Sequence, residues 1–119
     1  MIEVERVDYI AVPTRDVDRA KAFYGETLGL PHEKDTPVGA EYRAGQVTVG
    51  IVGSADGGQE FAPNPAGFAL RVPDVDAARE TLAQAGVTVT EVYDTGVCRL
   101  AFFSDPDGNR LVLHRRYAP

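Results

Sequence analysis

The feature that most constrains the fold of this chain is an internal repeat. Residues 68–78 (Phe-Ala-Leu-Arg-Val-Pro-Asp-Val-Asp-Ala-Ala) parallel residues 10–20 (Ile-Ala-Val-Pro-Thr-Arg-Asp-Val-Asp-Arg-Ala) at one constant offset. In both copies a short apolar run precedes an Asp-Val-Asp sequence, which is typical of a helix N-terminus because Asp caps the first turn. The match of these caps and of the apolar residues beside them indicates a duplicated unit.

The first copy predicts a strand, a helix and three further strands. Val7–Val12 is an apolar run closed by Pro13 and predicts a strand. From the Asp16 N-cap, apolar residues recur at helical spacing up to Gly29, where the helix should stop. Shorter runs punctuated by turn residues predict strands at about 30–34, 40–43 and 46–52.

The second copy predicts the same order of elements. A helix over 74–85 should end at Gly86, and strands are expected at 87–93, 97–103 and 110–115. The predicted fold class is therefore α+β, with two βαβββ modules in tandem, each a curved mixed sheet with a helix on its outer face. We expect a single domain over 1–119, with module one at about 1–53, a linker at about 54–66 and module two at about 67–119.

The predicted linker leaves two interpretations open. Its residues, and those that flank it, are mostly Gly, Pro and small polar residues with no period. Such a segment is either a connection between the modules or a flexible loop over a site.

Close to the C-terminus, residues 102–113 predict a β-hairpin. The apolar run stops at Ser104, and Asp-Pro-Asp-Gly-Asn then supplies turn chemistry. Pro106 presets φ, Gly108 can take positive φ, and the side chains of Asp105 and Asn109 can cap the local backbone.

This hairpin sequence resembles the closing hairpin of the vicinal oxygen chelate superfamily, which includes glyoxalase I, bleomycin resistance proteins, fosfomycin-modifying enzymes and extradiol dioxygenases. Phe23-Tyr24 followed by Leu28-Gly29-Leu30 is a second stretch similar to that family. The resemblance covers essentially the whole chain and implies tandem βαβββ modules. A ferredoxin-like fold is the main alternative, but it would require the order βαββαβ.

The resemblance also implies four positions where metal-dependent members carry ligands, usually His and Glu. Counted from the repeated Asp caps and from the hairpin, these positions fall on Tyr9, Gly67, Val112 and about Val49. A divalent ion prefers imidazole nitrogen and carboxylate oxygen, and none of these four residues is a good ligand. We therefore predict no metal and no cofactor.

Strand alternation predicts which residues line the concave face of the sheets. The expected ligand-binding residues form a largely apolar surface with a few polar groups, typical of a small-molecule site: Tyr9, Val47, Val49, Ile51, Arg71, Arg110, Val112 and His114. Tyr9 could instead only fill the sheet, and the arginines could pair with carboxylates across it. His114 could equally be solvated or contact a dimer partner.

Three possible functions follow. The first is a metal-independent small-molecule-binding protein resembling bleomycin resistance proteins, and the family implies a homodimer. The alternative is a glyoxalase-like lyase or isomerase, or a dioxygenase, with non-standard or relocated catalytic residues, for which the candidates are Tyr9, His114 and Glu91. A third possibility is an accessory protein whose pocket has closed.

Composition and charge exclude two classes of partner, nucleic acid and membranes. The net charge of −6 argues against nucleic acid, which needs a basic face. There is no apolar run near the ~20 residues that a membrane span requires, and the N-terminus lacks the pattern of a signal peptide. The single cysteine, Cys98, fits a reducing compartment. We expect a cytoplasmic protein with no membrane partner.

Overall fold

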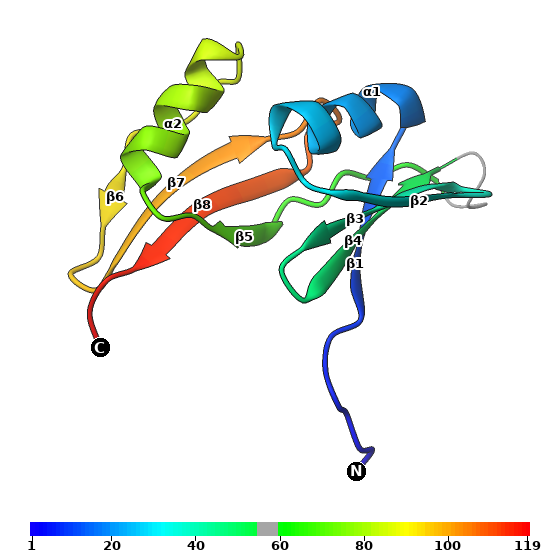
Figure 1. The fold of residues 1–119 in the computed structure, drawn as a ribbon, viewed down its shortest axis with the longest axis horizontal. Coiled ribbons are helices and arrows are strands. Elements are labelled where there is room, and N and C mark those ends of the chain that lie inside the picture. The colour runs from blue at the N-terminus through cyan, green and yellow to red at the C-terminus, as the bar shows by residue number, and fades with distance from the viewer. Residues whose placement is uncertain (55–59) are drawn as a thin grey trace. The chain divides into compact units, whose positions relative to one another are not determined.

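The protein is described here by a computed structural model, which covers residues 1–54 and 60–119. The chain divides into two compact units, Met1–Ala62 and Pro63–Pro119, which correspond to the two predicted modules (Figure 1). Residues 55–59, in the middle of the predicted linker, lie outside the described residues. That the modules form a single domain stays a prediction.

Module one contains β1 (Tyr9–Thr14), α1 (Val17–Ala22), the π-helix η1 (Phe23–Thr27), β2 (His32–Thr36), β3 (Gly39–Ala44) and β4 (Val47–Gly53). The strands form a four-stranded sheet in the order β1-β4-β3-β2. β1 is parallel to β4, and the other neighbours are antiparallel. The βαβββ order predicted for this module is confirmed.

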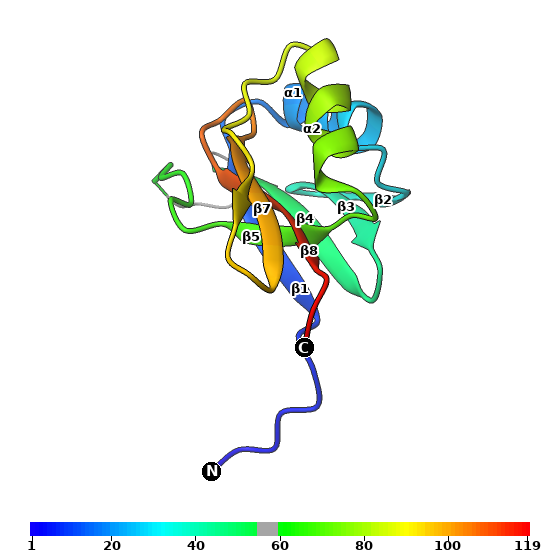
Figure 2. The ribbon, with the colours of Figure 1, turned by 90° about the vertical axis from the view of Figure 1, so that its left-hand side faces the viewer.

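Module two repeats this topology with β5 (Phe68–Arg71), α2 (Val75–Gln84), β6 (Tyr93–Asp94), β7 (Cys98–Ser104) and β8 (Arg110–Arg116). Its sheet has the order β5-β8-β7-β6, again with one parallel pair, β5 and β8. Figure 2 shows β7 and β8 side by side with α2 over this sheet. The duplication predicted from the sequence is therefore a duplication of structure.

Both helices begin where the repeated Asp residues cap them. The Asp16 carboxylate accepts a hydrogen bond from the Arg19 amide at 3.1 Å, and the Asp74 carboxylate accepts one from the Ala77 amide at 3.0 Å. Both cap residues have extended backbones, as an N-cap requires. The first helix was expected to be one continuous element, but its second half is a π-helix, in which the Leu28 amide bonds to the Phe23 carbonyl.

Two strand predictions need correction. Of the predicted strand 87–93, only Tyr93 lies in a strand, as part of β6. At Thr90 the amide donates to the Phe102 carbonyl at 2.9 Å, but the Thr90 hydroxyl, in place of its carbonyl, accepts the Phe102 amide at 2.9 Å, so the strand ladder is interrupted there. Pro13 was expected to end the first strand but lies inside β1. Proline is tolerated there because β1 is an edge strand, so the missing amide hydrogen of Pro13 does not cost the sheet a hydrogen bond.

Each sheet buries one face beneath its own helix. In module one the buried side chains include Val12, Tyr24, Val49 and Ile51, and in module two they include Leu82, Ala101, Phe103, Leu111 and Leu113. In the described residues, the opposite face of each sheet carries no helix of its own module, and we call it the helix-free face. No helix in the described parts of the chain has the length and apolar character to cross a membrane.

Candidate ligand-binding site

The helix-free face of module one is set by the register between β1 and β4. Tyr9 pairs with Thr48, and Ala11 pairs with Gly50. Partners in a sheet point to the same side, so these four residues share the helix-free face. Tyr9 is 64% exposed, and its ring lies 3.8 Å from the position that a Gly50 Cβ would take.

This register contradicts part of the predicted lining. Val47, Val49 and Ile51 alternate with Thr48 along β4 and therefore point to the opposite side, toward α1. Val49 and Ile51 are 0% and 1% exposed and belong to the core. The prediction that these three residues share the face of Tyr9 is wrong, because an almost wholly apolar strand does not reveal which of its faces is the buried one.

Polar side chains that the sequence prediction missed occupy this face instead. The Arg43 guanidinium lies 3.0 Å from the Glu33 carboxylate, and the Thr48 hydroxyl donates to the same carboxylate at 3.3 Å. With Tyr9 and Glu41, Arg43 and Thr48 border a shallow hollow of about 220 Å³. The alternation of Glu41 and Arg43 within β3 is the sequence signal that could have indicated them.

The helix-free face of module two is organised by the hairpin turn before β8. The buried Asp105 carboxylate accepts the amides of Asp107 and Asn109 and the Asn109 side-chain amide, at 2.8 to 3.0 Å. The Asn109 side-chain oxygen accepts the Asn64 amide at 2.8 Å, and the Asn64 carbonyl accepts the Arg110 amide at 2.8 Å. The predicted capping of the local backbone is confirmed for Asp105, whereas the Asn109 side chain bonds to the Asp105 carboxylate and to the distant Asn64 amide. These bonds fix where Arg110 enters the sheet.

The register between the strands of this sheet shows which side chains share the helix-free face. Arg71 lies beside His114, and His114 lies beside Leu100. One row along, Val112 lies beside Phe102. The face as a whole comprises Ala69, Arg71, Tyr93, Cys98, Leu100, Phe102, Ser104, Arg110, Val112, His114 and Arg116. Whether Arg71, Arg110, Val112 and His114 bind a ligand stays a prediction.

Aromatic side chains lie at the centre of this face and contact their neighbours there. The Arg110 guanidinium carbon lies 5.2 Å from the centroid of the Phe102 ring, a cation–π arrangement. The Tyr93 ring contacts Phe102 edge to face at 6.1 Å. Among residues 1–54 and 60–119, no carboxylate forms an ion pair with Arg71 or Arg110. The alternative in which these arginines pair across the sheet is not seen in that part of the chain.

The three candidate catalytic residues are not linked to one another. Tyr9 lies at the start of β1, His114 lies in β8, and Glu91 is exposed in the segment between α2 and β6. Within the described residues, no side-chain hydrogen bond is made by any of the three. Their catalytic role stays a prediction.

The family's metal-ligand positions do not supply a suitable donor set. Ala11 and Ala69 are equivalent in the repeat and pair with Gly50 and Val112, so the counterpart of Val112 is Gly50, not Val49. The module-one positions are then Tyr9 and Gly50, and the module-two positions are Gly67 and Val112. A single phenol oxygen among two glycines and a valine does not fit a divalent ion.

The backbone at Gly67 excludes the usual histidine. Its φ is +69°, and a Cβ there would lie 1.9 Å from the Arg110 carbonyl oxygen. Elsewhere in the described chain, no group of three or more His, Cys, Asp or Glu side chains is placed to hold a metal ion. The residues present therefore do not fit the metal that the family implies.

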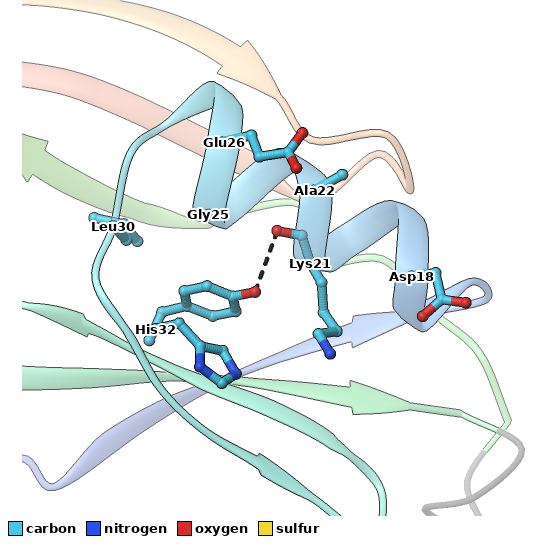
Figure 3. Close-up of a pocket in the computed structure, with 8 residues that line it drawn as sticks. Asp18, Lys21, Ala22, Gly25, Glu26, Leu30 and His32 are labelled. Carbon is cyan, nitrogen blue, oxygen red and sulfur yellow. Dashed lines mark hydrogen bonds between the residues drawn. The ribbon is translucent and has the colours of Figure 1, made fainter.

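A second hollow, of about 410 Å³, lies on the helix side of module one (Figure 3). Lys21 Nζ and His32 Nε2 both approach Asp35 Oδ1, at 2.8 and 2.9 Å. Hydrogen bonding by Lys21, and then by His32, lowers the pKa of the Asp35 carboxyl, while Asp35 raises the pKa of Lys21. The Tyr42 hydroxyl donates to the Lys21 carbonyl at 3.2 Å, and burial raises the pKa of Tyr42.

The sequence did not predict this cluster, because residues three apart in a regular strand point to opposite faces. A register shift between His32 and Lys34 inserts one extra residue, and it turns His32 and Asp35 to the same side.

The fold and the hairpin can be compared with known proteins. The family model described as the Glyoxalase/Bleomycin resistance protein/Dioxygenase superfamily matches residues 6–113. The chain belongs to this superfamily. The vicinal oxygen chelate resemblance inferred from the hairpin is therefore confirmed. A search of curated protein sequences found no match.

Several solved structures are similar to this chain. TnmS3, an antibiotic binding protein from Streptomyces sp. CB03234, is 30% identical with a TM-score of 0.81, over 98% of this chain and 100% of that chain. A glyoxalase/bleomycin resistance protein from the same organism is 31% identical with a TM-score of 0.75, over 92% and 100%. A lactoylglutathione lyase from Agrobacterium tumefaciens is 17% identical with a TM-score of 0.80, over 94% of each chain, and this likeness shows the fold alone.

Proposed function

We propose that this superfamily member is a metal-independent small-molecule-binding protein that takes its ligand on the helix-free faces of its sheets. The observation that carries the proposal is the helix-free face of module two. There, half-buried Leu100, Phe102 and Val112 form an apolar centre bordered by Arg71, Arg110 and His114. An apolar surface with a few polar groups at its border is the usual composition of a small-molecule site.

Two further observations support the proposal. The donor set at the family's ligand positions does not fit a divalent ion, so binding here depends on side-chain contacts. In addition, the antibiotic binding protein TnmS3 is 30% identical over nearly the full length of both chains. The lyase and dioxygenase alternative stays a prediction, because the described catalytic candidates form no hydrogen-bonded pair.

The proposal includes a homodimer, which the family resemblance implies. Size-exclusion chromatography with light scattering measures this directly. A mass of twice 12.8 kDa supports the dimer, and a monomer at micromolar concentration contradicts it.

The binding proposal is tested by a thermal-shift screen of small molecules on chelator-treated protein, with hits mapped by amide NMR shifts. We expect hits to perturb Leu100, Phe102 and Val112 more than Leu111 and Leu113, which alternate with them and are buried under α2. Val112→Glu should abolish binding, because it places a carboxylate in the apolar centre. A screen without hits, or hits that leave this face unperturbed, would overturn the proposal.

A further inference from the structure

We infer that the helix-free face of module two selects small aromatic anions, such as aromatic carboxylates or phenolates. This inference rests on the proposed function and adds the chemical class of the ligand. Three properties of the face carry it: the sign of its charges, the lack of carboxylates among its described residues, and the arrangement of arginine over an aromatic ring.

The charge of this face is opposite to that of the chain. The protein has a net charge of −6, yet the face defined above holds three arginines, Arg71, Arg110 and Arg116, and its described residues include no Asp or Glu. The helix-free face of module one differs, since Arg43 there is already paired with Glu33 at 3.0 Å. A face of unneutralised arginines attracts an anion in preference to a cation.

The positions of the basic groups suit a flat ligand with a charged end. Arg110 lies near one end of β8, and Arg71 lies beside His114, four residues further along. At the rise of a β-strand, the two rows are about 13 Å apart, with Val112 and Phe102 between them. An aromatic ring system resting on this centre would have an arginine within reach at either end.

The Arg110 guanidinium is held in an orientation that favours a carboxylate. Its carbon lies 5.2 Å from the Phe102 ring centroid, and the Tyr93 ring contacts Phe102 in turn. A guanidinium over a ring is attracted to the ring, while its N–H groups stay available for the two oxygens of a carboxylate. Arginine serves this purpose better than lysine because its donors form a rigid fork.

The inference is tested with three probes that share one ring system and carry an anionic, a neutral or a cationic substituent at the same position: 2-naphthoate, 2-naphthamide and 2-naphthylmethylamine. Their affinities are measured by calorimetry at pH 7.5 and low salt, and their sites are mapped by amide NMR shifts. We expect 2-naphthoate to bind at least tenfold more tightly than the other two. Its affinity should also fall as the salt concentration rises.

Matched variants locate the effect. Arg110→Gln and Arg71→Gln should each weaken 2-naphthoate binding at least fivefold, while Arg115→Gln should leave it within twofold. Arg115 follows His114 in β8 and lies on the opposite face, so it controls for the loss of one positive charge. An unchanged amide NMR spectrum in each variant verifies the fold.

The outcomes separate this inference from the proposed function. If 2-naphthamide or the amine binds as tightly as 2-naphthoate, or if none of the three binds, the anion preference is wrong, while the hits of the wider screen decide the binding function by themselves. If no compound of any charge perturbs this face, both fail. Weaker 2-naphthoate binding in the Arg115 variant, equal to that in the Arg110 variant, would also overturn the inference.

Discussion

Removing the Asn109 side chain tests the turn that organises module two. Asn109 is 2% exposed, and its side chain joins Asp105 to Asn64 through two hydrogen bonds of 2.8 Å. Asn109→Ala leaves a buried carboxylate oxygen and the Asn64 amide without these partners. An unsatisfied buried group costs about 1 to 3 kcal/mol, and more when it is charged, so we expect a loss of about 3 kcal/mol in the free energy of unfolding.

The assay is urea denaturation, together with amide hydrogen exchange read at Asn64 and Asp107. We expect exchange at both amides to accelerate in Asn109→Ala. The Asn64 amide loses its acceptor, the Asn109 side-chain oxygen, and the Asp107 amide bonds to the Asp105 carboxylate that Asn109 holds in place. Ser104→Ala, an exposed change in the same hairpin, should stay within about 0.5 kcal/mol. A loss below about 1 kcal/mol in Asn109→Ala, with normal protection at Asn64, would show that the Asn109 side chain does not hold this turn.

Three further predictions concern the glycine positions and the helix-side hollow. Gly67→His should cost more than about 2 kcal/mol in urea denaturation, since the φ of Gly67 is +69° and a Cβ there would lie 1.9 Å from the Arg110 carbonyl oxygen. Gly50→Ala should cost less than about 1 kcal/mol, since a Cβ at Gly50 meets its nearest atoms at 3.8 Å, and equal costs for the two variants would contradict this. Tyr42→Phe removes one hydrogen bond and should cost about 1 kcal/mol by the same assay, so no change would count against the bond. The pKa of Asp35 in the folded protein lies below its usual value near 3.8. The ionised Asp35 carboxylate therefore contributes its full stabilisation above pH 3.8, and this stabilisation is lost as the pH falls through the folded-state pKa. An NMR titration midpoint at or above 3.8 would contradict this.

The topology could be predicted because it depends on signals local to the sequence. Asp16 and Asp74 indicate helix N-termini through their own side chains, and the Asp-Pro-Asp-Gly-Asn sequence indicates a turn that reverses the chain. The repetition of the Asp caps and of the apolar residues beside them is sufficient to indicate two modules with the same order of elements. The shared face of Arg71, Arg110 and His114 also followed from alternation, since β8 alternates buried Leu111 and Leu113 with less buried residues.

Other features depend on pairing between strands, which no local pattern reveals. β4 is apolar or small at nearly every position, so only its register with Tyr9 shows that Val49 and Ile51 are core residues. The extra residue at Glu33 depends on how β2 meets β3, and it created both the Glu33–Arg43 pair and the His32–Asp35 contact. The face of the sheet on which the predicted residues lie was consequently predicted better in module two than in module one.

The claim that binding is independent of metal is tested most directly by one measurement. Metal content and the affinity of the tightest hit from the thermal-shift screen are determined on the same protein sample, before and after treatment with a chelator and again after incubation with nickel, zinc, manganese and ferrous iron. We expect far less than one ion per chain and an unchanged dissociation constant throughout. Near-stoichiometric retention of any one ion, with binding lost on chelation, would contradict it.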